Sequence, residues 1–212
     1  PLARVASALL PYLRGARSLG NHHIYDEGRA LLGEGVQYRR ELFLARLGML
    51  PFLWLMLAVC ARWGGRIGGG AGAGLASLFV ATNPNLLAHA GIAGTDLAPA
   101  AFVVATTYAW LRWREEPTVA RAIVFGLTAG LAATTKFSAL AFLAGTLVLG
   151  EVVRFLMARR AGYASGRAAS WRSVLIVAGT AALVIWAVYR FHVGPVTPGG
   201  VPVPAPEFFA GL

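Results

Sequence analysis

The sequence is poor in cysteine, in lysine and in acidic residues. Cys60 is its one cysteine, which excludes an internal disulfide bond and any cysteine-based metal site. Lys136 is the one lysine among 19 basic residues, and only 9 residues are acidic. Charged residues make up 13% of the chain, against about 25% in soluble domains. This composition argues against a soluble globular protein.

Nucleotide and nucleic-acid binding are also disfavoured. The glycine-rich run 64–70 lacks the Lys-Ser/Thr pair that completes a phosphate-binding loop, so it is predicted to be a cytoplasmic turn between helices. The formal net charge of +10 could attract nucleic acid. The arginines, however, cluster at the ends of apolar runs, as in the cytoplasmic loops of membrane proteins. We therefore expect no nucleic-acid partner.

Long apolar segments dominate what the sequence does contain, and 57% of the residues are hydrophobic. A membrane-spanning helix needs about 20 mainly apolar residues, with about 17 as a lower bound. The chain is therefore predicted to be an all-α, multi-pass transmembrane helical bundle with about six visible spans. The apolar segments are 43–63, 68–87, 97–113, 122–135, 137–156 and 174–188.

Arginine-rich connections predict which way the spans run. Segments 112–121 and 154–172 are both rich in arginine and should both lie in the cytoplasm. An even number of crossings must separate them, so residues 122–156 should form two helices that meet at an outer turn around Lys136. The same rule places residues 83–96, and the chain after Tyr189, outside.

The first 41 residues are predicted to be an external segment that lies on the membrane surface. Leu2, Val5, Leu9, Leu10 and Leu13 repeat at helical spacing, which is typical of an amphipathic helix in a bilayer interface. A second short amphipathic piece is expected at 28–38. The predicted organisation is thus 1–41 external, 42–191 transmembrane, and 192–212 an external Pro/Gly-rich segment in which 195–206 form a linker. We expect the chain to be an internal piece of a longer protein.

Two charges at the ends of spans are candidate functional residues. Asp96 stands between two apolar stretches, and Lys136 stands at the predicted outer turn, so both fall on the same predicted side of the membrane. A charge at such a depth costs free energy unless it faces water, a partner or a substrate. His89, near Asp96 in sequence, and Arg46, near the outer end of the first visible span, are further candidates.

A structural role is the alternative for each candidate. Asp96 would cap the helix that opens at Leu97, and Lys136 and Arg46 would extend their charged ends to the membrane surface. His89 would form a hydrogen bond at a helix end. Two interpretations are possible for the polar residues His22, His23, Asp26 and Glu27. They could bind a metal, but adjacent histidines in a polar loop are usually solvated, so no metal ligand is assigned.

Three motifs read together resemble a known family. They are residues 83–90 followed by Thr95-Asp96-Leu97, then Gly126-Leu127 leading to 134–140, and the opening Pro1-Leu2-Ala3, which looks like the end of a His-Pro-Pro-Leu motif. This pattern resembles bacterial glycosyltransferases of the GT-C superfamily, the dolichyl-phosphate-mannose protein mannosyltransferase-like and aminoarabinose transferase-like group. The resemblance covers roughly residues 1–160.

The resemblance implies an inner-membrane enzyme whose active site faces the periplasm or exterior. It would move a sugar, with inversion, from a polyprenyl-phosphate carrier to an acceptor protein, lipid or glycan; no other cofactor is implied, and metal dependence stays open. The family's general base would lie upstream of Pro1, and Asp26 and Glu27 do not replace it. Asp96 would act as a secondary catalytic residue, while Lys136, His89 and Arg46 would bind the substrate or the lipid phosphate.

Two other classes of function stay open. In a transporter or lipid flippase, Asp96 and Lys136 would be charges that line the transport pathway. In an assembly subunit of the cell envelope, neither residue would take part in chemistry. An inverted repeat of the spans would favour transport, whereas an acidic pair upstream, before a complete His-Pro-Pro-Leu motif, would favour the enzyme.

Overall fold

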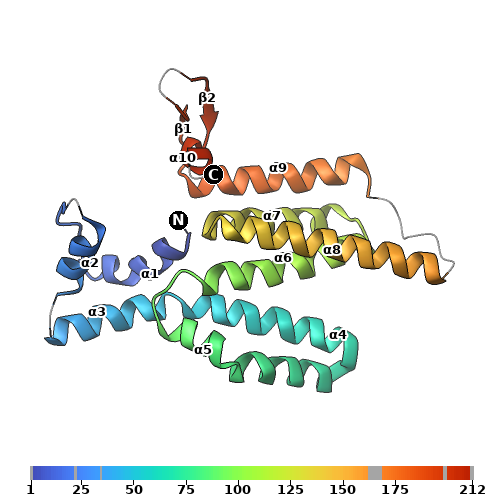
Figure 1. The fold of residues 1–212 in the computed structure, drawn as a ribbon, viewed down its shortest axis with the longest axis horizontal. Coiled ribbons are helices and arrows are strands. Elements are labelled where there is room, and N and C mark those ends of the chain that lie inside the picture. Colours follow the sequence, from blue (N-terminus) through green and yellow to red (C-terminus); the bar gives the residue numbers. More distant parts are fainter. Residues whose placement is uncertain (1, 22, 34, 162–168, 198–199, 211–212) are drawn as a thin grey trace. The chain divides into compact units, whose positions relative to one another are not determined.

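Helices account for nearly all the regular structure of the chain (Figure 1), as the sequence predicts. The computed structural model describes residues 2–21, 23–33, 35–161, 169–197 and 200–210. They separate into two compact units, Leu2–Ala98 and Pro99–Leu212, which are described in turn. The helices up to the boundary are α1 (Leu2–Leu13), α2 (Ile24–Leu32), α3 (Gly35–Leu47), α4 (Leu50–Thr82) and α5 (Pro84–Gly91).

The predicted amphipathic helix at the start of the chain is α1. It packs against the junction between α3 and α4, where a methyl group on Gly48 would lie 2.2 Å from the carbonyl oxygen of Ala6. Val5, Leu9 and Leu13 keep at least half of their surface exposed. This apolar face of α1 is therefore not used in the core of its own unit, and a bilayer surface could cover it.

The prediction of one amphipathic helix at 28–38 is wrong. α2 ends at Leu32, and Gly33 has a φ of +65°, a left-handed conformation that glycine adopts without the steric cost of a Cβ. Gly35 also has a positive φ, and α3 begins there. A glycine C-cap thus divides the expected helix in two.

The first expected span, 43–63, is interrupted. α3 ends at Leu47, and α4 begins at Leu50 with a proline in its first turn, where the missing N–H costs nothing. Pro51 cannot donate a hydrogen bond to the preceding turn, so it favours the start of a new helix at this point.

The glycine-rich run 64–70 forms the predicted turn. α4 contains non-helical residues at Gly68 and Gly69, so it is a hairpin of two helical arms. A methyl group on Gly64 would lie 2.4 Å from the carbonyl oxygen of Gly72, which shows that the arms touch through their backbones. The expected second span, 68–87, ends earlier than predicted, at Thr82, because Asn83 and Pro84 start α5.

The second unit is built around the packing of α7 on α9. It contains two small-residue contacts: Gly126 faces the Val177 carbonyl and Gly130 faces the Ala181 carbonyl, and a methyl group would lie within 2.8 Å of either oxygen. Glycines four residues apart allow membrane helices to pack closely. The helices of this unit are α6 (Leu97–Glu115), α7 (Val119–Thr135), α8 (Ser138–Ala161), α9 (Trp171–Val188) and α10 (Pro206–Ala210), with α6 beginning at the boundary.

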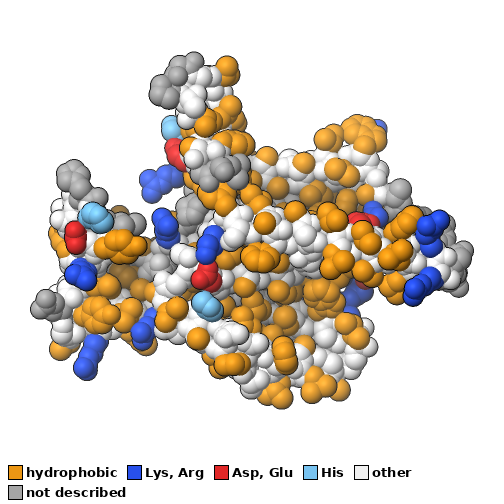
Figure 2. Space-filling model, in the orientation of Figure 1, with side chains coloured by type: hydrophobic (Ala, Val, Ile, Leu, Met, Phe, Trp, Pro, Cys, Tyr) orange, Lys and Arg blue, Asp and Glu red, His pale blue; other side chains and the backbone are white. Residues whose placement is uncertain are grey.

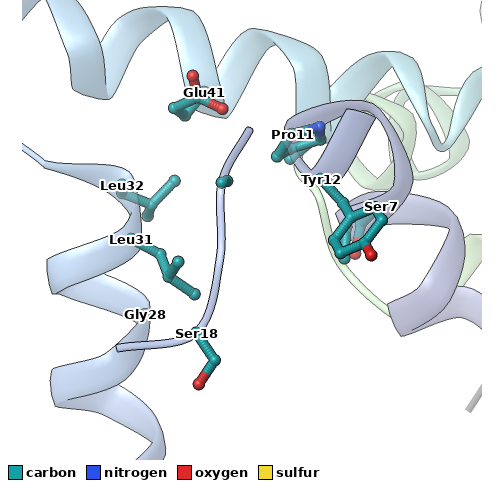
Figure 3. Close-up of a pocket in the computed structure, with 11 residues that line it drawn as sticks. Ser7, Pro11, Tyr12, Ser18, Gly28, Leu31, Leu32 and Glu41 are labelled. Atoms are coloured by element: carbon teal, nitrogen blue, oxygen red, sulfur yellow. The ribbon is translucent and has the colours of Figure 1, made fainter. Parts of the chain in front are cut away.

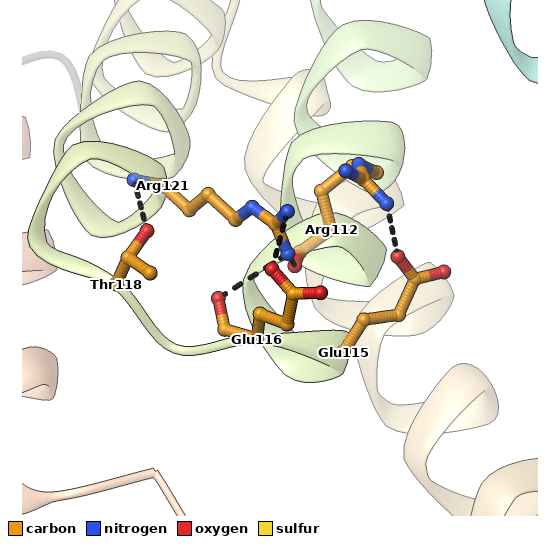
Figure 4. Close-up of polar contacts among 5 residues, drawn as sticks. All are labelled: Arg112, Glu115, Glu116, Thr118 and Arg121. Atoms are coloured by element: carbon orange, nitrogen blue, oxygen red, sulfur yellow. Dashed lines mark hydrogen bonds and ion pairs between the residues drawn. The ribbon is translucent and has the colours of Figure 1, made fainter.

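Residues 122–156 form two helices, as the charge pattern predicts, and the break falls at Lys136 and Phe137. Ion pairs connect the arginine-rich end of α6 to α8 and to the turn that leads into α7. Arg114 of α6 lies 2.7 Å from Glu151 of α8. In the α6–α7 turn, Arg121 pairs with Glu116 at 2.7 Å and donates to the Arg112 carbonyl (Figure 4). The two arginine-rich connections therefore begin at the same end of this unit.

The Pro/Gly-rich tail differs from the expected linker. Strands β1 (Val193–Pro195) and β2 (Pro202–Pro204) pair antiparallel, and α10 follows. The Ala205 N–H donates to the His192 carbonyl, and His192 forms an ion pair with Glu207 of α10. Prolines are tolerated at the ends of these strands, because a two-stranded ribbon has edges where no backbone N–H is needed for pairing with a neighbouring strand.

Three helical stretches among the described residues are long and apolar enough to cross a membrane: Gly35–Thr82, which joins α3 and α4, Ser138–Arg160 and Trp171–Val188. The outer surfaces of α8 and α9 carry large exposed apolar side chains, such as Phe142 and Leu183. Figure 2 shows hydrophobic side chains along α8 and basic ones at its end. Such a surface is typical of lipid-facing helices.

Candidate functional site

His89 and Asp96 come together in the first unit. His89 lies in the last turn of α5, and its Nδ1 is 4.0 Å from Oδ2 of Asp96, just before α6. That distance suits an ion pair with a protonated imidazole but exceeds a hydrogen bond. Both side chains are about half exposed.

Local sequence positions this pair. The Asn83 side chain accepts hydrogen bonds from the N–H groups of Asn85 and Leu86 at 3.1 and 3.2 Å, which caps α5. Pro84 occupies the first turn, where proline is favoured. α5 then runs for 8 residues, which brings His89 to its C-terminal end. A cation there is favoured by the helix dipole.

The sequence predicts that His89 forms a hydrogen bond at the end of its helix. Its Nδ1 is shielded from solvent and has no hydrogen-bond partner within the described residues. Nδ1 therefore does not form the expected hydrogen bond within the described residues. α6 does begin at Leu97, directly after Asp96. The capping role of Asp96 stays a prediction.

Arg46 lies in the last turn of α3 with an exposed side chain. The Arg46 carbonyl accepts a hydrogen bond from the N–H of Met49, in the short connection to α4. A basic residue at a helix C-terminus is favoured by the dipole. This position alone accounts for the arginine, and its phosphate-binding role stays a prediction.

Lys136 lies in the second unit and ends α7 with an extended backbone, φ −160° and ψ 140°. Its side chain is exposed, and α8 begins two residues later. The preceding Thr134 and Thr135 are buried, and their hydroxyls donate to the carbonyls of Leu131 and Ala132. These bonds tighten the last turn of α7 and hold the position from which the lysine emerges.

An apolar cavity of about 540 Å³ lies at the same end of the second unit as Lys136. Phe137, which follows the lysine, packs its ring 5.6 Å from that of Phe208, and Phe208 lines the cavity. Sequence reasoning missed this feature because it treated the tail as a linker. The lining residues come from α9 and the tail: Ala182, Ile185, Trp186, Val196, Val203, Pro204, Ala205, Phe208 and Phe209.

Glu27, one of two acidic residues in the first turn of α2, has a structural role. Its carboxylate accepts hydrogen bonds from the Ser18 hydroxyl and the Leu19 N–H, both at 2.6 Å, and from the Asn21 N–H at 3.0 Å. These bonds, the Ser18 hydroxyl first, lower the pKa of Glu27 to about 2. The charge thus organises the 18–21 loop.

The metal alternative gains no support. His22, one of its proposed ligands, lies outside the described residues. In the part of the chain that the structure describes, no group of three or more His, Cys, Asp or Glu side chains is arranged to hold a metal ion.

His89 and Asp96 are brought together in the first unit. Arg46 belongs to the same unit, and Lys136 belongs to the second unit. Comparison with protein-family models, with curated proteins and with solved structures finds no match to this chain. The family resemblance accordingly rests on the sequence motifs alone.

Proposed function

We propose that the protein is a GT-C-type membrane glycosyltransferase that moves a sugar from a polyprenyl-phosphate carrier to an acceptor at the outer face of the bacterial inner membrane. The bundle would cross the membrane about six times. The observation that carries the proposal furthest is the apolar cavity beside the turn that follows Lys136, because its surface suits an isoprenoid chain.

The chemistry of the transfer explains the need for a cation. Negative charge grows on the leaving phosphate as the glycosidic bond breaks, and a fixed positive charge lowers the energy of that state. Lysine suits this role as a compact point charge. Lys136 would hold the carrier phosphate while the apolar cavity takes up part of its lipid chain.

A carboxylate is needed at the acceptor. An inverting transfer requires a base within about 2.6–3.2 Å of the acceptor proton. The resemblance implies a main base in an external loop, and no residue of this chain is assigned that role. Asp96, whose side chain is about half exposed, would then orient acceptor or sugar hydroxyls, with His89 beside it.

Sugar transfer by the full-length protein in membrane vesicles tests the proposal. Lys136→Met removes a charge-assisted contact worth about 1.5–3 kcal/mol, so transfer efficiency should fall roughly 10–100-fold. Asp96→Asn removes the charge but retains shape and some capping ability, so a role in transfer predicts lost activity in a folded protein. The assay follows release of labelled sugar from a panel of polyprenyl-phosphate donors.

Matched variants test whether the positive charge is needed at position 136 itself or whether the loss of any exposed cation reduces transfer. Lys136→Arg should retain more activity than Lys136→Met, and Arg160→Met, which removes a cation from the C-terminal end of α8, should behave as wild type. Wild-type transfer in both Lys136→Met and Asp96→Asn would contradict the assigned roles. Movement of the carrier lipid across the vesicle membrane without sugar transfer would instead support a flippase.

A further inference from the structure

A separate cavity of about 370 Å³ lies among α1, α2 and α3 of the first unit (Figure 3). Its volume is within the range of about 300–1,000 Å³ that is usual for small-molecule sites. Leu31 and Leu32 of α2 form one wall, and Pro11 and Tyr12 form the other. None of the candidate residues of the proposed transfer reaction lines it, so this cavity is independent of that proposal.

Glu41 of α3 brings a carboxylate to this largely apolar space. Its Oε2 is shielded from solvent and has no hydrogen-bond partner among the residues that the structure describes. A carboxylate oxygen in such a place costs free energy unless a donor meets it.

The neighbouring polar groups are engaged elsewhere. The Ser7 hydroxyl donates to the Arg4 carbonyl at 3.0 Å, and the Ser18 hydroxyl donates to Glu27. The guanidinium of Arg17 lies 3.9 Å above the Tyr12 ring and donates to the Tyr12 carbonyl at 2.5 Å. The lining thus offers an acceptor at Glu41, and no described residue donates a hydrogen bond to its Oε2.

We propose that this cavity binds a cationic amphiphile, a protonated primary amine attached to a small alkyl or aromatic body. The ammonium group would donate a hydrogen bond to the Glu41 carboxylate and would also balance its negative charge. A charge-assisted hydrogen bond of this kind is stronger than a neutral one. The apolar walls bury the body of the ligand. A ligand with a carboxylate in place of the amine would be repelled by Glu41. A ligand with an alcohol would supply a hydrogen-bond donor but no positive charge.

Photolabelling of the protein in zwitterionic nanodiscs tests this site. The probe is hexylamine that carries a diazirine on its alkyl chain, and the same chain ending in an alcohol or a carboxylate provides the comparison. Mass spectrometry locates the label. We expect the amine to label the segments that line the cavity, including 28–32, at about one tenth of the concentration that the alcohol requires.

Variants at the cavity decide the role of Glu41. Glu41→Gln keeps the shape but removes the charge, so the advantage of the amine over the alcohol should disappear. Asp26→Asn removes an exposed acid that does not line the cavity, and should leave that advantage intact. Ala8→Phe adds a ring at an exposed lining position and should block both probes.

Three results would overturn the proposal. They are equal labelling by amine and alcohol in the wild type, an unchanged preference for the amine in Glu41→Gln, and labelling that Ala8→Phe does not reduce. Because the readout is binding at a mapped site, it does not depend on sugar transfer, and a failure of the proposed enzyme activity leaves this test intact.

Discussion

The indole N–H of Trp113 donates a hydrogen bond to the hydroxyl of Ser173 across 2.6 Å, and this bond joins α6 to the first turn of α9. Both residues are buried. The Trp113 ring also packs 5.4 Å from the ring of Phe125 in α7. A tryptophan at the arginine-rich end thus ties three helices of the second unit together.

Loss of the Ser173 hydroxyl should destabilise the protein. Ser173→Ala leaves a buried indole N–H without its acceptor, which costs about 1–3 kcal/mol. Denaturant unfolding in detergent measures the effect. Ser77→Ala is the matched control, because the Ser77 hydroxyl donates to the Ala73 carbonyl of its own helix. Equal stability of the two variants would show that the bond between α6 and α9 contributes nothing specific.

Gly126 should not tolerate a side chain. In Gly126→Ala the new methyl group would lie 2.5 Å from the Val177 carbonyl oxygen and 2.8 Å from Cβ of Thr180, so α7 and α9 must move apart. Overpacking of this kind costs about 1–3 kcal/mol. Gly145→Ala in α8 meets open space and should be neutral or slightly stabilising. Thermal unfolding of both variants compares them, and a neutral Gly126→Ala would contradict the close packing.

The turn at Lys136 should be accessible from outside the cell. With Cys60 replaced by alanine, Ser138→Cys places one thiol at the exposed start of α8, and Arg160→Cys places one near its end. A membrane-impermeant maleimide should label Ser138→Cys in intact cells and Arg160→Cys only after the membrane is opened, since arginine-rich ends stay in the cytoplasm. The reverse pattern would invert the predicted topology.

The 18–21 loop should loosen in acid. Glu27 has a pKa lowered from 4.5 to about 2 by its hydrogen bonds, so its stabilising contribution is present above pH 4.5 and is lost as the pH falls towards 2. Protection against hydrogen exchange at the amides of Leu19 and Asn21, measured relative to the intrinsic exchange rate at each pH, should therefore fall over that interval. Glu27→Gln should show fast exchange already at neutral pH. Exchange rates that depend on pH alike in wild type and variant would count against this role.

Local signals in the sequence were sufficient to predict most helices. The break at Lys136, the start of α6 after Asp96 and the turn at Gly68 and Gly69 all occur where the charge pattern or the glycines predict them. Such features depend on a few neighbouring residues, so they can be recognised without knowledge of the fold. The errors at 28–38 and 68–87 arose because the glycine cap at Gly33 and the cap at Asn83 were not recognised as helix boundaries.

The candidate chemistry was harder to predict than the helices. Asp96, His89 and Lys136 stood out as polar residues at the ends of apolar runs, but their environments depend on contacts between distant segments. The cavity beside Phe137 requires α9 and the tail to meet the end of α7, and the environment of Glu41 requires α1 and α2 to cover α3.

The sequence by itself determined the membrane-type composition, the helical class and the position of most turns, because apolar length, arginine placement and glycine act locally. Only the tertiary structure decided which glycines face a neighbouring backbone, which buried polar groups find partners and which do not. Those outcomes depend on close packing between residues far apart in the chain, such as Trp113 and Ser173, and no local pattern encodes that packing.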